Sequence, residues 1–201
     1  MEGTAEITLW QYLERLDQDI TLAINAIHSP FSDTVWKIFS DKEIWYPMYL
    51  IVAVLIFVRL GWKKGLVSTL MIILTIVACD QFANLVKDTA ERLRPCWDEY
   101  MLDNGLRRLE HNGNWYGFFS AHAANAMGFA VGSLMAFRND TPRKYRVWGI
   151  FIISWALLVG ISRIFVGKHF FGDVLVGFTV GACFAALLAM AGRVIIKKLN
   201  L

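Results

Sequence analysis

Two histidines and a carboxylate have residue types and a spacing that suit chemistry. His169 and Asp173 are four residues apart, so in a helix their side chains can meet directly. A histidine can attack phosphorus when its other ring nitrogen donates to a carboxylate, which sets the tautomer and supports the developing cation. A second histidine can protonate the departing oxygen, and His122 is the candidate for that role. The pattern therefore favours phosphoryl transfer.

Three cations could hold the phosphate in such a reaction. Lys87 and Arg94 are seven residues apart, so we expect a continuing helix to place them on one face, two turns from each other. Pro95 is expected to end that helix. Arg163 lies at the end of a later apolar run. Guanidinium groups bind phosphate oxygens in a bidentate geometry, which makes both arginines candidate phosphate ligands.

A predicted helix N-terminus offers further donors. Ser120 and the backbone N–H groups of Ala121 and His122 stand where a helix would begin, and such an end is a natural anion site. The sequence has no acidic cluster for Mg²⁺ and no Cys/His spacing for zinc. We therefore expect a reaction that proceeds through a phosphohistidine and needs neither a metal nor another cofactor.

The chain that positions these groups is strongly apolar. It has 201 residues, of which 56% are hydrophobic and 18% charged, and its mean hydropathy is +0.45. Soluble domains are nearer 45–50% apolar and about 25% charged. The net charge of +3 implies no nucleic-acid partner. Three cysteines form no even disulfide framework, and Cys79 and Cys183 fall inside apolar runs. These features indicate a membrane protein.

Five apolar runs predict an all-α, polytopic membrane bundle. At roughly 20 residues per span, the length allows five to six transmembrane helices. The runs cover residues 44–58, 65–86, 115–137, 147–162 and 174–192. Glycines four residues apart, in the pairs Gly128/Gly132 and Gly177/Gly181, favour close packing between helices.

Residues 1–43 are predicted to form a separate N-terminal segment, and residues 44–201 the transmembrane domain that carries the site. Apolar residues recur at helical spacing from Leu9 to Ile27, with acidic residues on the other side. Ser29-Pro30 should break that helix before a second short amphipathic one. No cleaved signal peptide is expected. We expect amphipathic helices that lie in the membrane interface. The alternative is a sixth helix packed on the bundle.

Charge predicts the orientation of the bundle. The three short connections and ends that five spans place on one side carry ten basic residues and one acid, Asp140. The positive-inside rule makes that side cytoplasmic. We therefore expect a multi-pass protein of the inner (cytoplasmic) membrane whose site faces the periplasm or exterior. The ten basic residues are Arg59, Lys63, Lys64, Arg138, Arg143, Lys144, Arg146, Arg193, Lys197 and Lys198.

Three motifs, in this order, resemble those of the type 2 phosphatidic acid phosphatase superfamily, which also includes vanadium haloperoxidases and glucose-6-phosphatase. They are Lys-x6-Arg-Pro from Lys87, Ser-x-His from Ser120 and Ser-Arg-x5-His-x3-Asp from Ser162. The resemblance implies a metal-independent lipid phosphatase with His169 as nucleophile, Asp173 as its orienting partner and His122 as general acid. The residues that it implies for phosphate binding are Lys87, Arg94, Ser120, Ala121 and Arg163.

The second motif departs from the superfamily's usual Pro-Ser-Gly-His. Phe119 stands in place of Pro and Ala121 in place of Gly. If residue 121 needed a positive φ, alanine would add strain there. His111, in the acidic connection after the second run, is interpreted as a surface residue.

A phosphate site at the outer membrane face suits the headgroup of a lipid in that leaflet. The chain resembles small bacterial members that act on undecaprenyl pyrophosphate, which is our first substrate prediction, on phosphatidylglycerophosphate or on lipid A. Four phenylalanines beside the motifs could admit a lipid tail or could simply pack the bundle; they are Phe118, Phe119, Phe170 and Phe171. Two rival functions are a lipid phosphotransferase that uses the same site and a non-catalytic transporter or scaffold for anionic lipid. The expected partners are a lipid phosphate substrate and the bilayer, with no obligatory protein partner.

Overall fold

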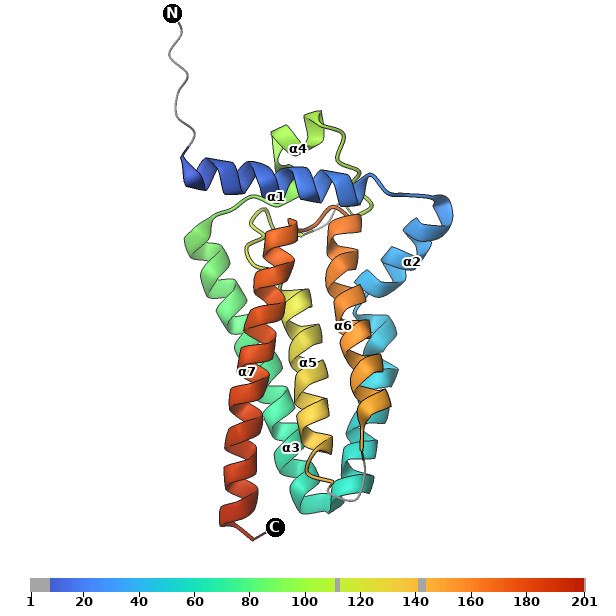
Figure 1. Ribbon diagram of the computed structural model, residues 1–201, viewed down its shortest axis with the longest axis vertical. Helices are drawn as coiled ribbons and strands as arrows, with labels where there is room; N and C mark the ends of the chain where they lie inside the picture. The colour runs from blue at the N-terminus through green and yellow to red at the C-terminus, as the bar shows by residue number, and fades with distance from the viewer. Residues whose placement is uncertain (1–7, 111–112, 141–143, 201) are drawn as a thin grey trace, which may run out of the picture.

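The computed structural model describes residues 8–110, 113–140 and 144–200, and the long elements of these ranges are all helices. Four of them stand side by side, and α1 (Leu9–Asn25) lies across one end of the bundle (Figure 1). The upright helices are α3 (Tyr46–Ala90), α5 (Ala121–Phe137), α6 (Arg146–Phe165) and α7 (Phe171–Lys198). The shorter elements are α2 (Pro30–Ser40), η1 (Glu43–Trp45), η2 (Pro95–Trp97) and α4 (Glu99–Asp103). The predicted all-α fold is confirmed. His111 and Arg143 lie outside the described residues.

Helix α3 consists of two arms that run in opposite directions. Gly61, with φ 74° and ψ 168°, interrupts it, and a glycine adopts this conformation without the cost of a Cβ. Figure 1 shows the first arm, residues 46–60, descending and the second arm, residues 62–90, returning. The arms correspond to the first two apolar runs.

Three helical segments within the described ranges are long and apolar enough to cross a membrane: Glu43–Ala90, Arg146–Phe165 and Phe171–Lys198. Helix α5 is shorter than its apolar run. The run was expected to be helical from Trp115, but α5 begins only at Ala121, because Ser120 adopts an extended backbone and caps the helix. The chain before Ser120 takes another course, which brings it to the functional site.

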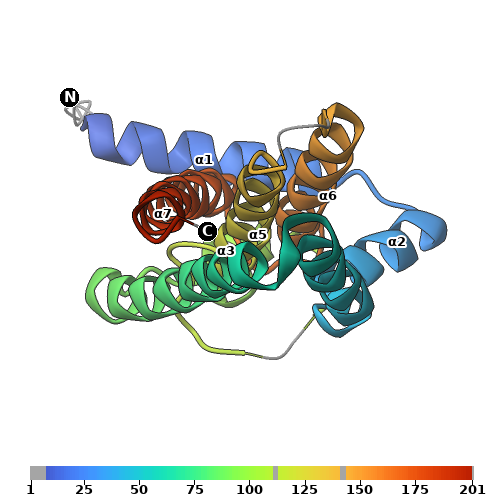
Figure 2. The same cartoon turned by 90° about the horizontal axis from the view of Figure 1, so that it is seen from below.

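Helix α5 lies at the centre of the bundle and contacts α3, α6 and α7 (Figure 2). Its contact with α7 is close because α7 has glycines there. A Cβ atom added at Gly177 would lie 2.6 Å from the carbonyl oxygen of Ser120, and one at Gly181 would collide with the carbonyl of Ala124. The predicted close packing of the small-residue pairs is therefore confirmed for Gly177 and Gly181.

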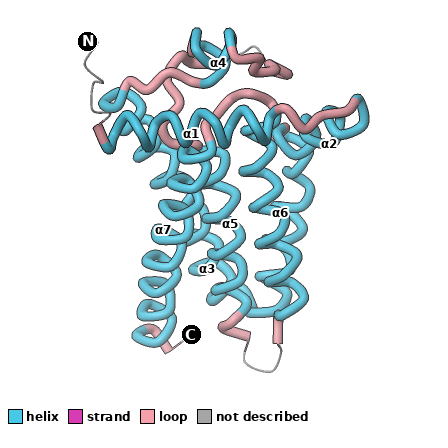
Figure 3. Tube along the Cα trace, turned by 45° about the horizontal axis from the view of Figure 1, so that its top comes forward, coloured by secondary structure: helices cyan, strands magenta, loops and turns pink. Residues whose placement is uncertain are grey.

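The N-terminal segment folds as two helices, with the predicted break at Ser29-Pro30. Ser29 caps α2 and Pro30 is its first residue. Figure 3 shows α1 lying across the ends of the upright helices. Its apolar residues Leu9 and Trp10 are 74% and 75% exposed, whereas Thr21 and Asn25 are buried against the bundle. The inward side of α1 is therefore mixed, because the apolar Leu22 and Ile24 also pack against buried clusters there.

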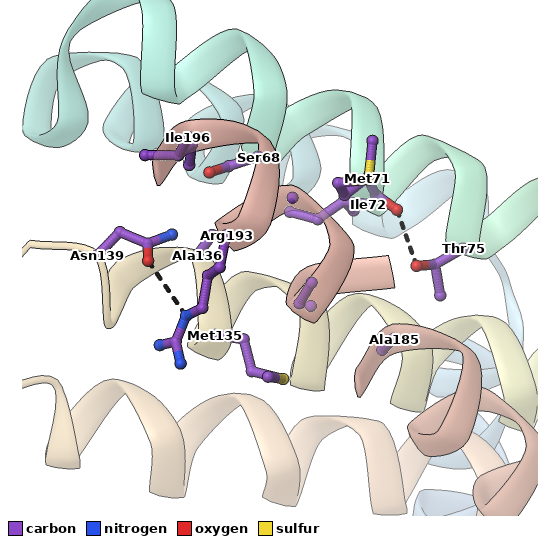
Figure 4. Close-up of a pocket in the computed structure, with 13 residues that line it drawn as sticks. Ser68, Met71, Ile72, Thr75, Met135, Ala136, Asn139, Ala185, Arg193 and Ile196 are labelled. Carbon is purple, nitrogen blue, oxygen red and sulfur yellow. Dashed lines mark hydrogen bonds between the residues drawn. The ribbon is translucent and has the colours of Figure 1, made fainter. Parts of the chain in front are cut away.

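A narrow cavity of about 10 Å³ lies between α3, α5 and α7 at the end of the bundle away from α1 (Figure 4). Arg193 Nε donates there to Asn139 Oδ1 at 3.2 Å. None of the predicted site residues lines this cavity. The predicted chemistry lies at the opposite end, beneath α1.

Candidate active site

The turn between α6 and α7 places His169 beside Asp173. Gly167 adopts φ 79°, and the backbone N–H groups of Lys168 and His169 both donate to the carbonyl of Arg163, at 2.9 and 3.2 Å. His169 Nδ1 then lies 3.3 Å from Asp173 Oδ2. The predicted contact is thus present, although His169 stands just before α7 and not within it.

Asp173 is completely buried, and both of its carboxylate oxygens have partners. Oδ2 also accepts the backbone N–H of Phe170 at 3.1 Å, as the third residue of a helix does in a capping box. Oδ1 accepts from Arg92 Nη1 at 2.8 Å. The backbone carbonyl of Asp173 accepts the N–H of Ser120 at 3.1 Å, which joins the starts of α5 and α7.

The predicted helix from Lys87 to Arg94 is wrong. Helix α3 ends at Ala90, and Glu91 adopts a left-handed conformation with φ 46°. The chain then pairs with residues 115–117, since Arg94 N–H donates to the Trp115 carbonyl and Gly117 N–H to the Arg92 carbonyl, each at 2.9 Å. The residue before a proline avoids the helical region, which explains why Arg94 is extended. Its Nε donates to the Tyr116 carbonyl at 3.1 Å.

The start of α5 contributes Ser120, Ala121 and His122. Ser120 is buried, and its Oγ accepts the N–H of Ala123 at 3.4 Å. The expected strain at Ala121 is absent, because the non-glycine residues with positive φ in the described ranges are Glu91 and Asn200. Ala121 can begin the helix with an ordinary backbone.

The two departures from the usual second motif therefore have a structural explanation. Phe119, where the motif usually has proline, is buried, and its ring centroid lies 5.7 Å from that of Phe82 on α3. Phe170 is buried as well. Phe119 packs within the bundle and Phe170 packs against Met101 and Leu106, so the structure favours the packing alternative for both. Phe118 and Phe171 are half-buried.

Among the residues that the structure describes, Arg163 and Lys168 each have a buried donor that makes no hydrogen bond. Arg163 Nη1 contacts the Ser40 hydroxyl and lies 3.5 Å from Glu110 Oε2. Arg163 Nε and Lys168 Nζ make no hydrogen bond within the described part of the chain. Buried donors nearly always have partners, so these two atoms are available to an anion.

The electrostatic environment keeps His169 neutral. Burial, followed by the positive charges of Arg94 and Arg163, holds the pKa of His169 well below its usual range. Lys87 and Lys168 act on His169 in the same direction. Arg163, His169 and Arg94 also lie within electrostatic reach of His122. All of the predicted ionisable residues therefore lie within electrostatic reach of His169.

Two cavities are each lined by one of the predicted site residues. One, of about 220 Å³, includes His122 and has mainly aromatic and apolar walls, among them Trp45, Tyr49 and Phe129. Asp80 also lines it and accepts a hydrogen bond from Asn125 Nδ2 at 2.8 Å. The other cavity, of about 590 Å³, is more polar and includes Lys87.

Sequence reasoning missed Arg92, Asp17 and Lys168 as members of the site. Arg92 was visible as a third cation of the Lys87–Pro95 segment, and Lys168 as the neighbour of His169. Nothing in the local sequence around Asp17 indicates its contact with Arg92, which spans 75 residues.

The PAP2 superfamily model matches residues 66–194, well over half of the chain. The chain belongs to the PAP2 superfamily. This membership confirms the family predicted from the three motifs, and with it a membrane lipid phosphatase. The match begins after α1, α2 and the first arm of α3, so the N-terminal helices lie outside the part that defines the superfamily.

Curated relatives include phosphatases of two lipids. The lipid A 4'-phosphatase of Bacteroides thetaiotaomicron is 34% identical over 178 residues, which cover 85% of this chain and 74% of the relative. That of Porphyromonas gingivalis is 28% identical over 85% of this chain and 70% of its own length. Phosphatidylglycerophosphatase B of Bacillus subtilis is 30% identical over 84% of this chain and 79% of its own length.

Two solved structures share the fold. The PAP2-type phosphatidylglycerolphosphate phosphatase of Bacillus subtilis superposes with a TM-score of 0.74 at 23% identity, covering 92% of this chain and 88% of its own. LpxE of Aquifex aeolicus gives a TM-score of 0.66 at 20% identity, covering 86% and 94%. The helical bundle is thus that of PAP2 membrane phosphatases.

Proposed function

We propose that this protein removes a phosphate group from the polar head of a membrane lipid, with His169 as the nucleophile. The observation that carries the proposal is the contact of 3.3 Å between His169 Nδ1 and the buried Asp173 carboxylate, beneath the cations of Arg94 and Arg163. Such a histidine is neutral, oriented and next to a place where an anion would be stabilised.

In the first step, Asp173 accepts the Nδ1–H of His169, which leaves the lone pair on Nε2 for attack. The Nε2–P bond forms while the bond from phosphorus to the lipid oxygen breaks. His122 gives its proton to that oxygen, so the lipid leaves as an alcohol. Lys87, Arg94 and Arg163 balance the charge on the phosphoryl oxygens, together with Ser120 and the N–H groups that begin with Ala121.

In the second step, water attacks the phosphohistidine. The water gives a proton to His122, the N–P bond breaks, and its electron pair returns to Nε2 of His169. Inorganic phosphate leaves, and both histidines recover their starting protonation states. In this scheme His122 transfers the proton in both steps, and the cationic side chains balance the charge on the phosphoryl oxygens. We therefore propose that the reaction proceeds without a metal ion.

A phosphate monoester on a glycolipid of the lipid A type is the substrate that we propose to test first. Two curated relatives are named as lipid A 4'-phosphatases, and one of them is 34% identical to this chain. Phosphatidylglycerophosphate is the alternative, because the third relative is named for it. The three relatives named above are not named for undecaprenyl pyrophosphate, our first prediction, which becomes a comparison substrate. The aromatic cavity at His122 offers apolar surface for the lipid part.

We also propose that the site faces the periplasm or exterior from the inner membrane. The support is the charge asymmetry: the predicted site residues lie at the end of the bundle beneath α1. The bend of α3 at Gly61, followed by Lys63 and Lys64, and the C-terminal end of α7, which carries Arg193, Lys197 and Lys198, lie at the other end of the bundle.

The test is release of inorganic phosphate by the detergent-purified protein in excess chelator. The lipids are lipid A, phosphatidylglycerophosphate, phosphatidic acid and undecaprenyl pyrophosphate, with no acceptor lipid added. We expect release from the wild type, none from His169→Ala, and a wild-type rate for His28→Ala, since His28 is exposed in the α1–α2 connection. Release that depends on an added acceptor would favour the phosphotransferase. Undiminished release by His169→Ala would refute the proposed mechanism.

A further inference from the structure

In the described part of the chain, Arg92 is the one side chain that donates to Oδ1 of Asp173, the carboxylate oxygen that does not contact His169. Asp173 Oδ2 serves His169 and the Phe170 N–H, while Oδ1 accepts only from Arg92 Nη1, at 2.8 Å. A buried carboxylate is costly unless a cation and hydrogen bonds compensate its charge. Arg92 supplies that compensation, because the Asp173 side chain is 0% exposed.

Arg92 is itself held on three sides. Its backbone carbonyl accepts the N–H of Gly117 at 2.9 Å, and its guanidinium lies 4.0 Å from the centre of the Phe170 ring. Nη2 donates to Asp17 Oδ2 at 2.8 Å. Burial acts to lower the pKa of Arg92, but the carboxylates of Asp173 and Asp17 outweigh it and raise that pKa, so the guanidinium stays charged.

Asp17 connects this pair to α1 and to the start of α7. Its Oδ1 accepts the backbone N–H of Gly172 at 2.7 Å, and the neighbouring Thr21 Oγ1 accepts that of Phe171 at 3.0 Å. The first N–H groups of a helix have no partner within the helix, and α1 satisfies two of them here. A Cβ at Gly172 would lie 2.9 Å from Asp17 Oδ2, so the contact needs a glycine.

We propose that Asp17 and Arg92 are positioning residues for the nucleophile, and that α1 is thereby part of the active site. The chain Asp17–Arg92–Asp173 holds the carboxylate against His169 Nδ1 and so keeps the lone pair on Nε2. Helix α1 lies outside residues 66–194, which match the PAP2 superfamily model, so the inference extends the site beyond that part of the chain. The inference rests on the proposed role of His169 and names what orients that residue.

Neither residue touches the phosphate in this arrangement, so the two kinetic constants should respond differently. Loss of an outer partner that orients a metal-binding histidine costs about 10- to 100-fold in activity, and we take that range for the analogous arrangement at His169. We expect Arg92→Gln to lower kcat for lipid phosphate by that factor and to leave KM within about twofold. Asp17→Asn should lower kcat by about tenfold, and Arg92→Lys should recover part of the activity by restoring the charge.

Arg107 and Asp33 provide a matched control. They also form an ion pair, at 2.6 Å, between the chain after α4 and helix α2. Their side-chain exposure is similar to that of Arg92 and Asp17, but they do not contact Asp173. Arg107→Gln and Asp33→Asn should leave kcat unchanged. Equal losses in both pairs, or a loss in the Arg92 and Asp17 variants that lies entirely in KM, would overturn the inference.

A second readout does not depend on activity. In ¹⁵N-histidine-labelled protein, the signal lost in His169→Gln identifies His169, and its shifts report which ring nitrogen carries the proton. We expect the Nδ1-protonated tautomer in the wild type and in Arg107→Gln, and a mixture of tautomers in Arg92→Gln. An unchanged tautomer in Arg92→Gln would refute the positioning role. A wild type that releases no phosphate would instead refute the proposed function, and the tautomer measurement would still decide this inference.

Discussion

Replacing Lys168 with methionine should change stability and anion affinity in opposite directions. The Lys168 side chain is 2% exposed, its Nζ has no hydrogen-bond partner within the described residues, and Arg94 and Arg163 add charge of the same sign. An unsatisfied buried polar group costs about 1–3 kcal/mol. Methionine fills a similar volume without that charge. We therefore expect Lys168→Met to raise the free energy of unfolding by about 1–2 kcal/mol in the absence of an anion.

The same substitution should weaken the binding of a phosphate analogue. A hydrogen bond from a charged donor contributes about 1.5–3 kcal/mol, which corresponds to roughly a 10- to 150-fold change in Kd. Lys168 lies next to His169 in the chain and within electrostatic reach of it, so its ammonium can contact an anion bound at Arg163. Orthovanadate, which resembles the transferred phosphoryl group, is the probe.

Chemical unfolding in detergent, with and without orthovanadate, measures both effects on one sample. Lys198→Met is the matched control, because Lys198 is exposed at the far end of α7 and should change neither quantity. A Lys168→Met protein that is less stable than the wild type, or that binds vanadate equally well, would refute the reasoning from the unpaired ammonium.

Lys168 also makes a pH-dependent contribution to stability. Burial lowers the pKa of Lys168 in the folded protein below the value of about 10.4 for an unfolded chain. Between these two values the unfolded chain binds the proton and the folded protein does not, so stability rises with pH across that window. The rise should be absent from Lys168→Met.

Two further predictions concern the nucleophile and the packing beneath it. Because the pKa of His169 is held well below its ordinary 6.5, the acid limb of kcat/KM should have its midpoint below pH 6.5; a midpoint above that value would contradict a buried, neutral nucleophile. Gly181→Val should abolish the monodisperse folded protein in detergent, because a Cβ there collides with Ala124, whereas Cys183→Val on the exposed side of the same helix should not. Equal recovery of both variants in size-exclusion chromatography would show that the α5–α7 contact can relax.

The parts of the site that depend on local spacing could be predicted from the sequence. His169 and Asp173 are separated by one helical turn, so their contact needs only the start of α7. The motif residues Lys87, Arg94, Ser120 and Arg163 were assigned from the resemblance, and the fold gathers them around His169. The long apolar runs similarly predicted the helices, because period and hydropathy are properties of the local chain.

The parts that depend on distant contacts could not be predicted. Arg92 meets Asp173 across 81 residues, and Asp17 meets Gly172 across 155. The segment from Lys87 to Arg94 has helical character by residue type, yet its last residues pair with 115–117 and prefer an extended backbone before Pro95. Likewise, α1 buries Thr21 and Asn25 while Leu9 and Leu13 are exposed, so the partner of each face could not be predicted from amphipathicity alone.

The glycine contact between α5 and α7 determines which parts of the protein can move. Backbone against backbone leaves no side chains to rearrange, so the two helices behave as one rigid body. Ser120 and Asp173 are joined by a hydrogen bond at the top of that body, so the proposed phosphate-binding end of α5 is held in place relative to the carboxylate that contacts His169. An opening that admits a lipid would therefore come from the surrounding elements, namely the first arm of α3 with α2, or segments 91–110 and 113–119. Substrate entry would thus depend on movement of the surrounding elements, whereas the proposed chemistry would take place on the rigid α5–α7 pair.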